Sequence, residues 1–69
     1  MTDDDLHRTI LLTAQRNPLA SDAKLGALVE CPTSTVRTVK DRYRTYAEIR
    51  ALFADERVDV DQLYNDLYF

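Results

Sequence analysis

The chain has 69 residues and a net charge of −3, with 45% hydrophobic and 30% charged residues, which fits one small globular domain. One cysteine excludes an intramolecular disulfide, and His7, expected on the surface, has no partners for a metal site. The acidic N-terminus is unlike a signal peptide and no apolar run reaches the ~20 residues of a membrane span, so we expect a cytoplasmic protein. Without a glycine-rich phosphate loop or a nucleophile beside a base, the sequence predicts neither an enzyme nor a cofactor.

Acidic and basic residues are distributed unevenly along the chain. Nine of the twelve acids are aspartates and only two of the nine basic residues are lysines, which is typical of proteins solvated in concentrated salt, as in halophilic archaea or their viruses. A small acidic protein of an ordinary cytosol is the alternative interpretation. Residues 31–50 carry a net charge of +3, against −2 for residues 1–30 and −4 for residues 51–69. The central segment is therefore the place where a nucleic acid would bind.

The first two predicted helices have clear beginnings and ends. One spans about 3–16, with Thr2 as N-cap and three aspartates in the first turn, where the helix dipole favours anions. It ends before Pro18, because the residue preceding a proline is pushed out of the helical region. The second helix follows Ser21 as N-cap and spans about 22–30.

Gly26 is the only glycine of the chain, and it stands inside the second predicted helix. A glycine costs about 1 kcal/mol there relative to alanine, so a packing reason is expected. We interpret it as the point where two helices approach too closely for a large side chain. On this interpretation alanine should be tolerated or slightly stabilising, whereas leucine should overpack the crossing.

A third helix follows a turn at 30–32, and its apolar side carries Val36, Val39 and Tyr43. The apolar positions of the second and third helices have the spacing of two short helices that cross at a steep angle. A T-x-x-E sequence at 45–48 favours a new helix after a break, because it has the form of a capping box. One long helix buried on two sides is the alternative.

The last predicted helix begins after Asp59, whose side chain is a suitable N-cap. We therefore expect an all-α fold with a tri-helical helix-turn-helix core and one or two additional C-terminal helices. The whole chain (1–69) would form a single domain, with the core at 3–44 and a helical extension at 45–69.

The segment NPLASDAKLGALVECPTSTVRTVKDRY resembles the DNA-binding helix-turn-helix of Lrp/AsnC-type and related winged-helix transcriptional regulators. Those domains share an N-P-x-x-S-x-x-x-L opening and an S/T-x-T-V run at the start of the recognition helix. Glu30 stands where the family usually has glycine, and no glycine-containing hairpin follows Tyr43, so the wing is absent. The resemblance implies a small sequence-specific DNA-binding transcriptional regulator with its helix-turn-helix at about 21–44 and with residues 33–41 facing the major groove.

The third helix supplies side chains of the kinds that contact duplex DNA. Its N-terminal residues would reach base edges, and Arg37 is the best candidate for a bidentate guanine contact. Lys40, Arg42 and Arg44 are predicted to contact phosphates, which position a protein without reading sequence. The predicted DNA-binding residues are Thr33, Ser34, Thr35, Arg37, Thr38, Lys40, Asp41, Arg42 and Arg44.

The basic cluster at 37–44, formed by Arg37, Lys40, Arg42 and Arg44, has two other interpretations. It is a solvated face if its cations pair with Asp41 and Glu48, as charged runs commonly do. Alternatively, the chain is a protein–protein interaction module with the same tri-helical fold, which binds an acidic partner of the transcription machinery through Arg37, Lys40 and Arg44.

The C-terminal segment 46–69 contains more large apolar residues than a three-helix core is expected to cover. We therefore expect a homodimer joined through this segment, which would place two recognition helices on half-sites about one DNA turn apart. The alternative is that the last helix folds back and completes a monomeric core.

Overall fold

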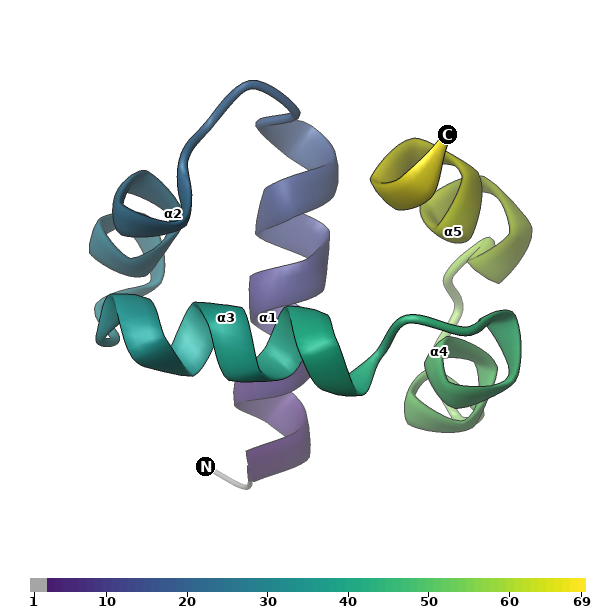
Figure 1. Cartoon of the computed structure of the whole chain (residues 1–69). Helices are drawn as coiled ribbons and strands as arrows, with labels where there is room; N and C mark the ends of the chain where they lie inside the picture. Colours follow the sequence, from purple (N-terminus) through teal and green to yellow (C-terminus); the bar gives the residue numbers. More distant parts are fainter. Residues whose placement is uncertain (1–2) are drawn as a thin grey trace.

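The computed structural model describes residues 3–69, which form five helices and, within that range, no strand (Figure 1). These are α1 (Asp3–Arg16), α2 (Asp22–Val29), α3 (Thr33–Arg42), α4 (Tyr46–Leu52) and α5 (Val60–Tyr68). The predicted all-α class is confirmed. No helix in this part of the chain is long and apolar enough to cross a membrane. Thr2, the predicted cap of α1, lies outside the described residues.

Side-chain caps begin three of the helices as the sequence predicts. Ser21, Thr45 and Asp59 each accept a hydrogen bond from the backbone N–H of the third residue of the following helix. The cap at Thr45 confirms the predicted break, because α3 has ended at Arg42 and α4 begins anew. The start of α3 differs from these three, since its N-cap is Pro32 and no side chain caps it.

The helices pack around one set of buried side chains. Figure 1 shows α3 lying across α1, with α2 on one side of α1 and with α4 and α5 on the other. Helices α1, α2 and α3 all contact one another, and α5 contacts both α1 and α4. The buried residues are Ile10, Leu11, Ala14, Leu25, Val36, Val39, Tyr43, Ile49, Leu52, Phe53 and Leu63.

Helix α5 folds back on its own domain. Leu63 is completely buried, and Tyr64 and Leu67 pack against the core. Most of the apolar surface in segment 46–69, on which the expected homodimer was based, is therefore covered within one chain. Three of its large apolar residues remain exposed, namely Tyr46, Tyr68 and Phe69.

His7 is partly buried, and the expectation that it lies on the surface was wrong. Its Nδ1 is 2.9 Å from the hydroxyl oxygen of Tyr43, and the two rings make an edge contact with centroids 5.5 Å apart. Because Tyr43 directly follows α3, this contact attaches the end of α3 to α1. Arg8, one residue further along α1, donates a hydrogen bond to the carbonyl oxygen of Leu52 and thereby attaches α4.

The turn between α2 and α3 explains the single glycine. Glu30 adopts the left-handed conformation, with φ 59° and ψ 47°, and its N–H donates to the carbonyl oxygen of Gly26. The N–H of Cys31 donates to the same oxygen at 2.9 Å. A Cβ atom on Gly26 would lie 2.7 Å from the carbonyl oxygen of Cys31. The tight packing expected at Gly26 is present, but it is against the backbone of the turn and not between two crossing helices. Contrary to the expectation, even alanine does not fit there without a shift.

Candidate nucleic-acid interface

Helix α3 has one buried side and one outward side. Val36 and Val39 are buried against α1 and α2, and helical geometry places Ser34, Arg37, Thr38 and Asp41 on the opposite side. All four of these residues are exposed. No packing in the described structure requires their side chains, so they are available to contact another molecule.

The hydroxyl residues of α3 are not equivalent. Thr33 and Thr35 are half-buried, whereas Ser34 and Thr38 are exposed on the outward side. The Thr38 hydroxyl donates to the carbonyl oxygen of Ser34 at 2.9 Å, so its oxygen is left to accept a further hydrogen bond. Because no side chain caps α3, N–H groups of its first turn also remain without an intrahelical acceptor.

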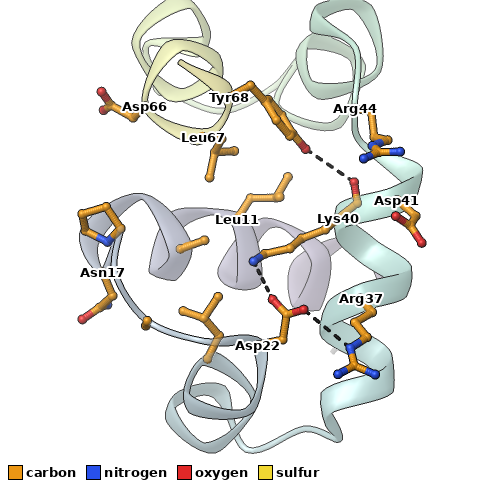
Figure 2. Close-up of a pocket in the computed structure, with 14 residues that line it drawn as sticks. Leu11, Asn17, Asp22, Arg37, Lys40, Asp41, Arg44, Asp66, Leu67 and Tyr68 are labelled. Atoms are coloured by element: carbon orange, nitrogen blue, oxygen red, sulfur yellow. Dashed lines mark hydrogen bonds and ion pairs between the residues drawn. The ribbon is translucent and has the colours of Figure 1, made fainter.

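Lys40 and Arg37 both pair with an acidic residue of α2. The Lys40 Nζ atom lies 2.6 Å from one carboxylate oxygen of Asp22, and the Arg37 Nε atom lies 3.6 Å from the other (Figure 2). The hydrogen bond from Lys40 is the main reason that the pKa of the Asp22 carboxyl lies below its usual value. Lys40 therefore points across to α2, and its charge is compensated within the protein.

The role of Asp22 was missed in the sequence, where it is only the first residue of the second predicted helix. It lies 18 positions before Lys40, on a different helix, and no local spacing indicates such a pair. The predicted solvated face was to pair with Asp41 and Glu48. Within the described residues, neither of them forms an ion pair with the basic cluster, and Asp22 is the acidic partner of Arg37 and Lys40 alone.

Arg42 and Arg44 are exposed at the C-terminal end of the same region. The Arg42 guanidinium lies over the ring of Tyr43, with its central carbon 5.6 Å from the ring centroid. Neither arginine has a carboxylate within ion-pair distance among residues 3–69. Their positive charges are therefore free to attract an external anion.

A groove of about 400 Å³ lies beside α3 and is lined by residues of α1, α2, α3 and α5 (Figure 2). Its apolar lining residues include Leu11, Leu25 and Leu67. Its charged lining residues are Asp22, Arg37, Lys40, Asp41, Arg44 and Asp66. The Lys40 side chain crosses the groove, so its charge is held by a hydrogen bond that joins α3 to α2.

Helix α5 supports the end of α3 from the other side of the groove. The Tyr68 hydroxyl donates to the carbonyl oxygen of Tyr43 at 2.5 Å. This carbonyl lies just past the last turn of α3, where backbone acceptors have no partner inside the helix. Desolvation of the phenol raises the pKa of Tyr68.

Comparison with known protein families, with curated proteins and with solved structures gave no match. The similarity to Lrp/AsnC-type regulators therefore stays a prediction from the sequence. Within the described residues, no group of three histidine, cysteine or acidic side chains is placed to hold a metal ion.

Proposed function

We propose that this chain is a small sequence-specific DNA-binding protein that regulates transcription, with α2 and α3 as a helix-turn-helix. The observation that carries the proposal is that α3 has an exposed outward side and that two exposed arginines lie beside it. In the described structure Arg42 and Arg44 form no ion pair, although the protein as a whole is acidic. A helix of this size fits the major groove, and free arginines beside it attract the phosphates that flank the groove.

Each exposed residue has a distinct proposed role. Arg37 reads guanine through its terminal N–H groups, while Ser34 and Thr38 hydrogen-bond to bases or phosphates. The Asp41 carboxylate accepts a hydrogen bond from the amino group of cytosine, which is a role for a negative charge on the side that faces DNA. Arg42 and Arg44 contact phosphates.

A selection experiment tests the proposal directly. The purified chain is incubated with a pool of randomised duplexes, and recovered sequences should share a motif. Arg37→Ala should relax the preference at one guanine by about 1–3 kcal/mol, whereas Arg42→Ala should weaken binding to all sequences alike. Arg57→Ala, which removes an exposed charge between α4 and α5, is the matched control. A folded protein without salt-sensitive binding to any duplex would contradict the proposal and leave the protein-interaction module as the alternative.

We also propose that the chain forms a homodimer through residues 46–69. The rings of Tyr46, Tyr68 and Phe69 all contact the ring of Tyr64, with centroids 6.0, 5.5 and 5.7 Å away. This aromatic cluster lies at the surface, and Phe69 is 89% exposed. Tyrosine and phenylalanine are enriched at protein interfaces, and a dimer would double the few base contacts of one α3.

Sedimentation equilibrium tests the dimer. At tens of micromolar the chain should sediment as a dimer, and Phe69→Ser should shift it toward monomer. Leu19→Ser is the control, because Leu19 is 99% exposed but lies in the loop between α1 and α2. A monomeric full-length chain in both dilute and molar salt would refute the dimer.

A further inference from the structure

Asp22 holds two of the cations that α3 would present to DNA, and it does so in two different ways. The ammonium group of Lys40 donates a hydrogen bond to one carboxylate oxygen at 2.6 Å. Arg37 places only Nε toward the other oxygen, at 3.6 Å, and its side chain remains 70% exposed. Its terminal nitrogens, which form the fork that recognises guanine, are therefore left free.

We infer that Asp22 is a specificity-determining residue of the DNA interface, because it withholds Lys40 from phosphate and orients Arg37 toward bases. The inference rests on the proposed DNA binding and assigns a role to a residue outside the recognition helix. Phosphate contacts by lysine strengthen binding to every sequence equally, so withholding one of them favours sequence-dependent contacts. Orienting Arg37 reduces the side-chain entropy that is lost when it binds a base.

The position of Asp22 explains why Lys40 cannot serve both partners. The two residues face each other across the groove, and the Lys40 side chain is only 38% exposed (Figure 2). To reach a phosphate, Lys40 must leave Asp22, and the released carboxylate would then lie beside the negatively charged backbone. Substituting asparagine at position 22 removes this competition and keeps the size of the side chain.

The expected effect is a steeper salt dependence. Per bound chain, Arg42 and Arg44 of the wild type neutralise about two phosphates, which gives a slope of about −1.8 in log affinity against log salt. Release of Lys40 in Asp22→Asn adds a third phosphate and a slope of about −2.7. Raising salt from about 50 to 200 mM should then weaken the variant about 42-fold, against about 12-fold for the wild type.

Fluorescence anisotropy with a labelled mixed-sequence duplex of about two helical turns measures this slope. The control is Asp61→Asn, which removes an exposed acid from the first turn of α5 and changes the net charge equally. Lys40→Gln should leave the wild-type slope unchanged and should abolish the gain in the Asp22→Asn background. Thermal melts establish that each variant is folded.

The outcomes separate the inference from the proposed function. A steeper slope in Asp22→Asn alone, with a weaker guanine preference when the selection is repeated, supports the inference. Equal steepening in Asp61→Asn shows a general effect of charge and overturns it. An unchanged slope in Asp22→Asn, or a shallower slope in Lys40→Gln alone, also overturns it while DNA binding stands. Failure of the wild type and of every variant to bind any duplex contradicts both the inference about Asp22 and the proposed DNA binding.

Discussion

Replacing Gly26 by alanine should destabilise the domain, although alanine is the better helix former. The new Cβ atom would lie 2.7 Å from the carbonyl oxygen of Cys31, with the amide nitrogen of Thr33 and the carbonyl carbon of Pro32 at 3.5 and 3.6 Å. All three neighbours are backbone atoms. They cannot rotate away as the end of a flexible side chain would, so the turn itself must move.

Two opposing terms determine the size of the effect. Helix propensity favours alanine by about 1 kcal/mol, whereas overpacking typically destabilises by about 1–3 kcal/mol. The turn resists movement because the N–H groups of Glu30 and Cys31 both bind the carbonyl oxygen of Gly26. We therefore expect the clash to be at the upper end of its range and the net loss to be about 1–2 kcal/mol. In a domain of this size that loss lowers Tm by roughly 4–16 °C.

Urea and thermal melts of three chains measure both terms. Ala27→Gly, at the exposed neighbouring position of α2, gives the propensity term alone and should cost about 1 kcal/mol. The clash is then the loss in Gly26→Ala plus that value. A Gly26→Ala chain as stable as the wild type, or more stable, would show that the turn moves freely and would refute the reasoning.

Three further predictions concern stability. Glu30→Gly should stabilise the chain by about 0.5–1 kcal/mol in urea melts, because Glu30 adopts a left-handed conformation that glycine reaches without strain, and a loss would contradict this. Leu63→Ala should cost about 2–5 kcal/mol, since Leu63 is fully buried, whereas Leu28→Ala, at a residue 47% exposed, should cost far less; equal losses would be inconsistent with α5 packing on the core. The pKa of Asp22 is lower in the folded chain than its usual value of 3.8, so the ionised carboxylate stabilises the fold at any pH above 3.8. This stability is lost as the pH falls through the lower folded pKa, and the difference in free energy of unfolding between wild type and Asp22→Asn should therefore shrink in acid. A difference that stays constant with pH would exclude this linkage.

Features fixed by local sequence were predicted well. The N-caps at Ser21, Thr45 and Asp59 depend on a side chain and an amide three residues apart, and all three are present. The break before α4 was predicted from the same local signal. The start of α3 at Thr33 also agrees with the predicted turn at 30–32, although Pro32 occupies the cap position and no side chain caps this helix.

Features that depend on contacts between distant helices were not predictable in the same way. The packing of α5 on α1 and α4 was one of two open alternatives, because an apolar face does not indicate whether its partner is its own chain or a second copy. The pairing of Asp22 with Lys40 joins α2 to α3, and the contact of His7 with Tyr43 joins α1 to the end of α3. Periodicity identifies the apolar side of each helix but not which polar residues meet across helices.

The acidic composition is typical of a protein in concentrated salt, whereas the proposed binding of phosphates by the α3 region is weakened by salt. In about 1 M salt the screening length is only about 3 Å, so attraction between separated charges is lost while contacts such as Lys40 with Asp22 persist. Each additional phosphate contact makes affinity more sensitive to salt, and withholding Lys40 reduces that sensitivity. With slopes of about −1.8 and −2.7, any advantage of Asp22→Asn over the wild type should shrink about eightfold for each tenfold rise in salt. Anisotropy measured from dilute to molar potassium chloride checks this, and an advantage that stays constant across the range would show that Asp22 does not restrain a phosphate-binding lysine.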